Sequence, residues 1–365
     1  MRKLDLYILK KLFVTFFFCL LLFTVVAVAV DSSEKADDFV KANLGTMGII
    51  KNYYLGFVPW IWSLLFPLFV FIAVIFFTSR MALRSEIIAI LAGGISYNRF
   101  LRPYLVGGVL LAGLLWVGSR YWIPRANSIR SNFQSTYIDK NDPTKNPSYG
   151  GCYNCYYLRI DSSTFIGIKD FDTTSKSART FFMERVRDNR VYYNLRAETM
   201  KWDTATGKWK LTNAMERTVD SMGERVTHHQ TYLLGIPLKP DELRKDYYLK
   251  DKLTTPELAT FINREEARGT EGLNTLKVER YRRTATPAAV LLLTLIGAVI
   301  ASRKTRGGSG MHLALGIVIA ALFIVSDRFS TVFATKGNFH PFLAAWLPNI
   351  VFAGVAFWLY RKTPK

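Results

Sequence analysis

The sequence predicts a helical integral membrane protein with six transmembrane helices and an inserted, outward-facing antiparallel β domain. Three observations lead to this fold class. Half of the 365 residues are apolar, and 14% are aromatic. The apolar residues gather in long runs without charge, although Lys and Arg outnumber Asp and Glu by 48 to 28. Between the third and fourth runs, the pattern changes to the two-residue alternation that is typical of β-strands.

Composition also excludes other protein classes. A soluble protein with a net charge of +20 commonly binds nucleic acid and spreads its basic residues over folded domains or tails. Here the charge-free apolar runs indicate a membrane protein instead, and we expect no nucleic-acid partner. The aromatic content excludes a disordered chain, and 24 Gly, 13 Pro and 3 Cys exclude collagen-like and disulfide-scaffold proteins.

Six segments are expected to cross the membrane, because about 30 Å of hydrocarbon requires roughly 20 apolar residues. They are residues 12–30, 52–79, 103–119, 284–302, 311–326 extending toward 335, and 337–360. The chain is therefore expected to divide into three parts. Residues 1–123 hold the first three helices, residues 124–283 hold the β domain and a linking helix, and residues 284–365 hold the last three helices.

The orientation follows from the distribution of basic residues in the short loops. The two termini and the loops 79–102 and 302–310 share one side, and they carry fourteen Lys or Arg residues against two acids. The short segments on the other side, 31–51 and 334–341, carry four basic and four acidic residues. We therefore expect both termini in the cytoplasm and the long segment between the third and fourth helices on the outer side.

The outward segment has the signals of an antiparallel β-sandwich or an open barrel. Val191, Tyr193 and Leu195 alternate with polar neighbours, and residues 201–209 read as two strand ends joined by a Gly-containing turn. After the strands, Thr254 precedes Pro256 and Glu257, which is the pattern that starts a helix.

Motifs for enzyme chemistry are missing from the sequence. It has no Gly-x-x-x-x-Gly-Lys-Ser/Thr loop, no His-Glu-x-x-His motif and no Gly-x-Ser-x-Gly motif. The adjacent His228 and His229 lie in strand-like sequence, so their side chains point to opposite faces and cannot easily bind one metal ion. We expect no catalytic residue, no cofactor, no metal site and no ATP hydrolysis by this chain.

Cys152 and Cys155 form a C-x-x-C pair on the outer side. A thioredoxin-type site would need a βαβ context, and a zinc site would need a second pair of ligands. A structural disulfide that closes a turn, or two free thiols, is the favoured interpretation. In an oxidising compartment, we expect the two cysteines to be joined to each other.

The inner segment near residues 82–96 has good helix formers followed by a Gly pair that ends the helix. In the loop 79–102, Glu86 is the single acid among four basic residues. Two interpretations are equally supported: Glu86 pairs with Arg84 or caps the helix, or a short cytoplasmic helix presents Glu86 to a cation of a partner. Near the outer boundary, Arg328 either marks a pathway or extends to the interface.

Short motifs then occur in a recognisable order along nearly the whole chain. They are Leu4-Asp5-Leu6-Tyr7-Ile8, Pro59 and Pro67, Ser85-Glu86 with Ala92-x-Gly94-x-Ser96, Trp122-Ile123-Pro124-Arg125-Ala126-Asn127, Glu279-x-x-x-Arg283-x-x-x-Pro287, and Ala345-Trp346-Leu347-Pro348-Asn349. In this order around an outward β domain, they resemble the transmembrane permease subunits of the lipopolysaccharide-export ABC transporter, the F-type and G-type pair. The opening motif and Val30-Asp31 are closer to the G-type, and the C-x-x-C pair is not part of the family pattern.

The resemblance implies a multi-pass protein of the bacterial inner membrane whose outward domain is a β-jellyroll. It implies a coupling helix that engages a separate ATPase dimer, which assigns ATPase coupling to Glu86, Ala92, Gly94 and Ser96. It also implies a second permease, as a paralogue or a second copy, and periplasmic jellyroll bridge proteins that receive the lipopolysaccharide.

Substrate binding is expected at the outer membrane boundary. The head group of a phosphorylated glycolipid is anionic, and Lys35, Lys41 and Arg328 lie at a suitable depth to bind it. Two other functions were weighed. A membrane-anchored scaffold whose β domain binds an envelope partner would not need six helices, and a secondary carrier would show acids at the middle of matched helices.

Overall fold

The computed structural model describes residues 3–139, 156–172, 175–188, 190–220, 222–243, 248–268, 272–303, 308–337 and 339–362. The chain forms two compact units, a helical one and one that contains the strands. The helical unit comprises Met1–Ile138, Lys250–Ala259 and Asn274–Lys365, and the strand unit comprises Asp139–Leu249 and Thr260–Leu273. These divisions differ from the expected ones at 123/124 and 283/284, because the third and fourth long helices continue beyond the apolar segments that marked them.

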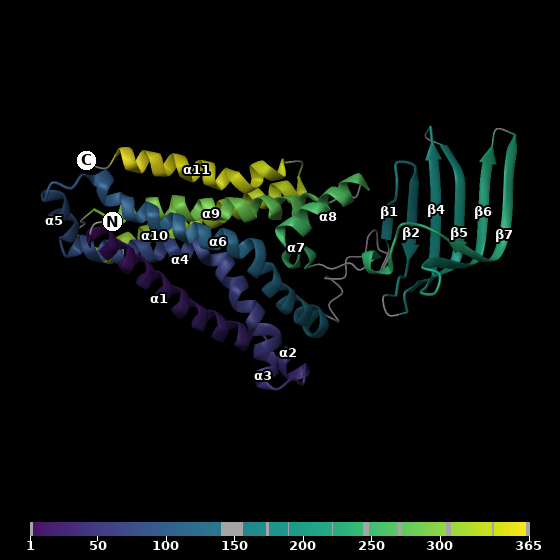
Figure 1. Ribbon diagram of the computed structural model, residues 1–365, viewed down its shortest axis with the longest axis horizontal. Helices are drawn as coiled ribbons and strands as arrows, with labels where there is room; N and C mark the ends of the chain where they lie inside the picture. Colours follow the sequence, from purple (N-terminus) through teal and green to yellow (C-terminus); the bar gives the residue numbers. More distant parts are fainter. Residues whose placement is uncertain are drawn as a thin grey trace. The chain divides into compact units, whose positions relative to one another are not determined.

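Six helices in the described part of the chain are long and apolar enough to cross a membrane, so the expected number of helices is confirmed. They are α1 (Lys3–Glu34), α3 with η1 and α4 (Thr46–Ile49, Ile50–Tyr54 and Leu55–Leu83), α6 with η2 (Tyr97–Phe133 and Gln134–Ile138), α9 (Asn274–Ala301), α10 (Gly308–Lys336) and α11 (Pro341–Arg361). Figure 1 shows both termini at the end of the helical unit where the short helix α5 (Glu86–Ala92) lies.

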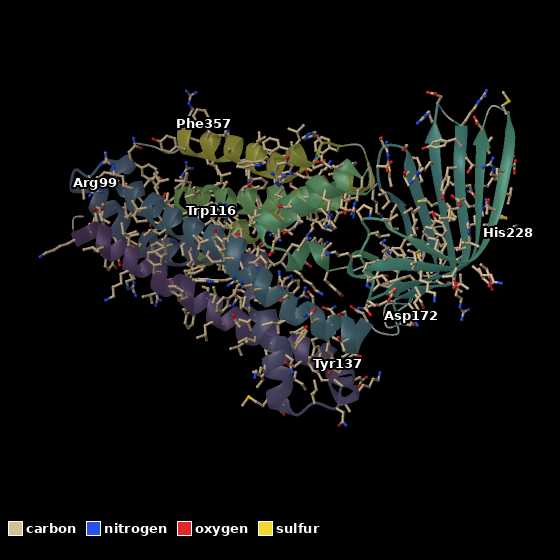
Figure 2. All side chains as sticks on the ribbon, turned by 45° about the vertical axis from the view of Figure 1, so that its right-hand side comes forward. Arg99, Trp116, Tyr137, Asp172, His228 and Phe357 are labelled. Atoms are coloured by element: carbon tan, nitrogen blue, oxygen red, sulfur yellow. The ribbon has the colours of Figure 1, made fainter. Side chains whose placement is uncertain are left out.

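The core of the helical unit is built around α4 and α9. The most apolar stretches of these helices are 56% and 67% buried, against 11% for α1 and 17% for α10. Phe69 and Val70 of α4 pack with Val290 of α9 and with Tyr104 of α6 in one buried cluster. The apolar side chains of α1 and α10 therefore remain largely exposed, as Trp116 of α6 and Phe357 of α11 do in Figure 2.

The inner segment is divided where the sequence predicted one continuous helix. The α4 helix ends at Leu83, and Ser85 has a φ of 59°, in the left-handed region that breaks a right-handed helix. The next helix, α5, starts at Glu86 and ends at Ala92, and Gly94 follows with a φ of 83°. The predicted stop at the Gly pair is confirmed, because glycine adopts a positive φ without a steric penalty.

The strands form one antiparallel sheet of seven strands in the order β1-β2-β4-β5-β6-β7, with β3 paired to β5. Their bounds are β1 Tyr156–Arg159, β2 Thr164–Lys169, β3 Ser177–Ala178, β4 Thr180–Arg187, β5 Arg190–Asp203, β6 Lys208–Asp220 and β7 Gly223–Leu234. Trp202 pairs with Trp209 across the β5–β6 turn, which confirms the predicted hairpin, and Gly207 takes a φ of 63° there. The antiparallel β domain is confirmed, and its closure into a jellyroll stays a prediction.

Short helical segments complete the chain: α2 (Ala36–Lys41), η4 (Pro240–Leu243), α7 (Leu249–Lys252) and α8 (Thr255–Ala267). The predicted helix start is confirmed at α8, where the Thr254 backbone N–H donates to Glu257 Oε2 at 2.8 Å. This is one half of a capping box. Hydrogen bonds from Thr254 hold the pKa of Glu257 below its ordinary value.

Candidate functional site

Two neighbouring arginines of α9, Arg282 and Arg283, donate hydrogen bonds to other segments of the helical unit and form a polar region there. Arg283 reaches the segment that contains α7. Its guanidinium donates to the carbonyl oxygens of Lys250 and Leu253, both at 2.8 Å, and its Nε lies 3.4 Å from Glu279 Oε1 one helical turn earlier. The Arg283 side chain is 8% exposed, so these carbonyl oxygens take the place of water around a buried charge.

Arg282 points in a different direction, because adjacent residues on a helix are about 100° apart. Its Nη2 donates to Asp327 Oδ2 at 3.0 Å and to Thr331 Oγ1 at 2.5 Å, and both acceptors belong to α10. The Nε of Arg282 is buried and has no hydrogen-bond partner within the described residues. Arg282 therefore joins α9 to α10 and retains one donor without a partner among the described residues.

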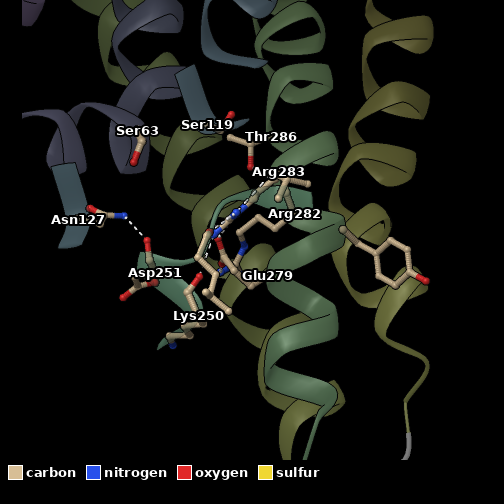
Figure 3. Close-up of polar contacts among 12 residues, drawn as sticks. Ser63, Ser119, Asn127, Lys250, Asp251, Glu279, Arg282, Arg283 and Thr286 are labelled. Atoms are coloured by element: carbon tan, nitrogen blue, oxygen red, sulfur yellow. Dashed lines mark hydrogen bonds and ion pairs between the residues drawn. The ribbon is translucent and has the colours of Figure 1, made fainter. Parts of the chain in front are cut away.

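Asp251 of α7 lies opposite the start of α9, as Figure 3 shows. Asn127 of α6 donates to the Asp251 carbonyl oxygen at 3.2 Å, and the Arg130 guanidinium lies 4.0 Å from the Asp251 carboxylate. Burial raises the pKa of the Asp251 carboxyl, and the charge of Glu279 adds to the rise, while Lys250, Arg130 and Arg283 oppose it. Desolvation outweighs the ion pair here, because 4.0 Å is a long separation and Arg130 also stacks on Trp60 at 4.2 Å from the ring centroid.

These groups line a polar pocket in the helical unit. Its residues come from α4, α6, α7, α9 and α10, and they include Trp60, Ser119, Asn127, Asp251, Glu279 and Arg283. An apolar cleft adjoins it between α4, α9, α10 and α11, with Leu64, Leu68, Leu293, Phe323 and Ile324 in its walls. The polar pocket and the apolar cleft have five lining residues in common: Ser63, Leu64, Arg282, Thr286 and Arg328.

The polar pocket and the apolar cleft therefore lie next to each other, with charged groups in the first and mostly apolar side chains in the second. Arg328 of α10 is exposed, and it forms no ion pair within the described residues. Its neighbour Asp327 pairs with Arg282 of α9. This arrangement of charge and apolar surface suits a molecule with an anionic head and a hydrocarbon tail.

The other two cations expected at the outer boundary lie elsewhere. Lys35, between α1 and α2, forms a 2.5 Å ion pair with Asp31 and a hydrogen bond with Tyr53. Its side chain is 19% exposed and sits beside aromatic rings of η1 and α4. Lys41 is exposed at the end of α2. Neither residue lines the polar pocket or the apolar cleft, so the structure brings Arg328 to that site without Lys35 and Lys41.

The four residues expected to couple the chain to an ATPase lie in residues 86–96, which we call the α5 segment. Glu86 and Ala92 are the first and last residues of α5, and Gly94 and Ser96 follow it. The hydroxyl of Tyr7 in α1 donates to Glu86 Oε2 at 3.1 Å, and Arg84 lies 3.9 Å from the Glu86 carboxylate. The Glu86 side chain is 30% exposed, and Ala92, Gly94 and Ser96 are exposed. Glu86 thus has a hydrogen-bond partner within the chain, Tyr7 of α1, and a carboxylate that remains partly accessible to solvent.

Sequence reasoning missed Arg282 and Asp251 as members of the site. The depth of Asp327 in its helix was the available signal for Arg282, because an acid at that depth requires a partner. Asp251 carries no comparable signal in the sequence. Cys152 and Cys155 lie outside the described residues, and no group of His, Cys, Asp or Glu that could hold a metal ion occurs in the part of the chain that the structure describes.

Comparison with known proteins identifies one family. The model of the family described as lipopolysaccharide export system permease LptF/LptG matches residues 6–362. This match includes most of α1, every strand and the polar pocket, and it leaves out only residues 1–5 and 363–365. No curated protein matches the sequence.

Proposed function

Because the chain belongs to the LptF/LptG family of lipopolysaccharide export permeases, we propose that it extracts lipopolysaccharide from the inner membrane as a subunit of an ABC transporter. A separate ATPase dimer drives the cycle, and the lipid passes to a periplasmic bridge of jellyroll proteins. Family membership alone makes the chain a permease of the lipopolysaccharide export system, and its six apolar helices suit a multi-pass protein of the inner membrane.

The observation that carries the substrate proposal is the position of the polar pocket next to the apolar cleft. Arg282 and Arg328 stand where the polar pocket and the apolar cleft meet. In the proposed site, phosphate groups of the lipid accept charge-assisted hydrogen bonds from Arg328 and from the unused Nε of Arg282. The acyl chains follow the apolar wall formed by residues such as Leu68 and Phe323. Lys35 and Lys41 bind the head group as it approaches the site.

A second permease is proposed as a partner, because α1 and α10 leave most of their apolar surface uncovered. Only 11% and 17% of their most apolar stretches are buried within the chain. A homologous permease that packs on these two helices encloses a cavity between the two chains. In this proposal the chain is of the G-type, and its partner is a paralogue or a second copy of the chain.

Coupling to the ATPase dimer is proposed for the α5 segment. Glu86 presents an accessible carboxylate edge, and the exposed Ala92, Gly94 and Ser96 allow a close approach of a partner surface. In the proposed orientation, both termini and α5 face the cytoplasm, and the strand unit is a jellyroll that faces the periplasm. Cysteines placed at Lys304 and Lys362 should then be protected from an impermeant thiol reagent in intact cells, and one at Lys208 should react.

The test is reconstitution of the complete transporter in liposomes. The chain, the partner permease and the ATPase are co-purified, and transfer of lipopolysaccharide to an added bridge protein is measured with and without ATP. We expect an ATPase that co-purifies with the chain and transfer that depends on ATP. A chain that binds envelope proteins but no ATPase would instead be a membrane-anchored scaffold.

A further inference from the structure

We propose that the ends of α1 and α4 nearest to α5 form a binding site for the headgroup of an anionic phospholipid of the inner leaflet. This site, the α1–α4 pocket, contains the cations Lys11, Arg80 and Arg84 and the apolar residues Val14 and Phe76. Its assignment to the inner leaflet rests on the proposed orientation of the chain. The site is separate from the polar pocket and the apolar cleft, which lie between other residues.

The α1–α4 pocket has more positive than negative charge. Lys11 and Arg80 are exposed and form no ion pair among the described residues. Arg84 is 59% exposed and lies 3.9 Å from Glu86, the one acid that lines the pocket. The Glu86 carboxylate already accepts a hydrogen bond from Tyr7. Three cations therefore face one acid, and a phosphate group complements the excess through charge-assisted hydrogen bonds.

Apolar side chains lie on the same helix faces as the cations. Val14 follows Lys11 by three residues on α1, and Phe76 precedes Arg80 by four residues on α4, so each pair shares one face of its helix. Val14 is 60% exposed and Phe76 is 45% exposed. Both residues lie one turn from their cation in the direction of the apolar centre of the helix. The order of charge and apolar surface therefore matches a lipid whose phosphate lies at the cations and whose acyl chains begin at Val14 and Phe76.

The succession of cations and apolar side chains along α1 and α4 distinguishes a lipid from other anions. A free phosphate ion or an acidic protein surface would use the cations but would leave the apolar half of the pocket uncovered. Lysine and arginine near helix ends also extend toward lipid headgroups while their stems cover apolar surface. The bound headgroup lies beside Glu86, and so next to the segment proposed to contact the ATPase.

The test compares two pairs of substitutions in the full chain, purified alone and as the transporter complex. Lys11→Gln with Arg80→Gln removes two charges from the α1–α4 pocket. Lys10→Gln with Arg102→Gln removes two exposed charges from the same end of α1 and from α6, outside the pocket. Native mass spectrometry counts bound lipid during titration with phosphatidylglycerol or with zwitterionic phosphatidylcholine. We expect phosphatidylglycerol to bind about thirtyfold more weakly to the first pair, since two basic residues near an anionic lipid together contribute about 2 kcal/mol.

A charge-preserving pair checks folding. Lys11→Arg with Arg80→Lys should keep phosphatidylglycerol binding within about threefold of the original chain, because it keeps both charges. The proposal is overturned if the control pair weakens binding equally, or if phosphatidylcholine binds as tightly as phosphatidylglycerol. Competition by millimolar inorganic phosphate would identify an anion site instead of a lipid site. Loss of the ATPase with unchanged lipid binding would identify a protein-docking surface. Lipid binding by the chain alone is independent of whether the complete transporter exports lipopolysaccharide.

Discussion

Arg282 of α9 donates a hydrogen bond to Asp327 of α10, with 3.0 Å between Nη2 and Oδ2. The two side chains are 25% and 27% exposed, so their charges are only partly hydrated. The bond joins two membrane helices beside the apolar cleft. Removal of Arg282 leaves Asp327 without its cation, and removal of Asp327 leaves Arg282 only the longer 3.9 Å ion pair with Glu279.

The first prediction is that Arg282 and Asp327 are energetically coupled. Arg282→Gln and Asp327→Asn should each lower the stability of the purified chain by about 1–3 kcal/mol, since each removes a hydrogen bond between charged groups. The double substitution should cost less than the sum of the two, by about 1 kcal/mol. Thermal unfolding of the four proteins in one detergent measures this coupling, and additive effects would contradict it.

The second prediction is that Arg328 contributes to lipid binding, whereas Lys35 contributes to the stability of the fold. Arg328→Gln should reduce crosslinking of lipopolysaccharide to the cleft about tenfold without changing the unfolding temperature, because Arg328 is exposed and has no ion pair in the described structure. Lys35→Gln should lower the unfolding temperature, because it leaves Asp31, which is 7% exposed, without its cation. Lys41→Gln, at an exposed position on α2, is the control for stability. Unchanged crosslinking in the Lys35, Lys41 and Arg328 triple variant would show that none of the three residues binds the lipid.

The contrast between Arg328 and Lys35 shows how far the sequence could predict the site. Hydropathy and the loop charges were sufficient for six helices, because a membrane span requires a long run of apolar residues wherever it packs. The contact of Lys35 with Tyr53 was not predictable, because Tyr53 lies in another helix and helix pairing cannot be read from one sequence.

In the strands and in the inner segment, too, features with a local sequence signal were predictable and the others were not. The β5–β6 hairpin was predictable because its alternation and its Gly207 turn are local signals. The break at Ser85 was not predictable, because serine seldom adopts a positive φ and the surrounding residues favour a helix. The contact of Asp251 with Asn127 joins residues that are 124 positions apart, and nothing in either local pattern indicates it.

The third prediction concerns the pH dependence that Asp251 produces. Its pKa in the folded chain lies above the ordinary value of 3.8, so the folded chain holds this proton more tightly than the unfolded chain. The resulting stability is fully present below pH 3.8 and is lost as the pH rises through the folded pKa. Asp251→Asn should therefore remove this pH dependence without lowering the unfolding temperature at pH 7. Unfolding temperatures measured between pH 4 and 7 test this, and a clear drop at pH 7 would show that the ion pair with Arg130 outweighs desolvation.

The fourth prediction is that Arg283 holds the segment that contains α7. Its guanidinium donates in two directions to the carbonyl oxygens of Lys250 and Leu253, which a single ammonium group cannot reproduce. Arg283→Lys should increase hydrogen exchange of residues 250–255 at least tenfold while exchange in the middle of α9 stays unchanged. Arg280→Lys on the same helix is the control, because Arg280 contacts only the Tyr281 ring in the described structure. Equal protection of 250–255 in both variants would contradict this role.

The last prediction is that Glu86 transmits movement between the ATPase and α1. A carboxylate that accepts a hydrogen bond from Tyr7 and keeps an accessible edge can contact an arginine of the ATPase without leaving α1. Truncation of one member of a desolvated charge pair costs about 2–5 kcal/mol, so Glu86→Ala should strongly reduce both export and retention of the ATPase. Glu86→Lys should be worse, because it adds a cation beside Arg84. Tyr7→Phe removes only the internal hydrogen bond, so it should lower export while the ATPase stays bound. Pull-down of the ATPase and reconstituted export distinguish these outcomes, and export at the original rate with Glu86→Lys would show that Glu86 is only a solvated helix cap.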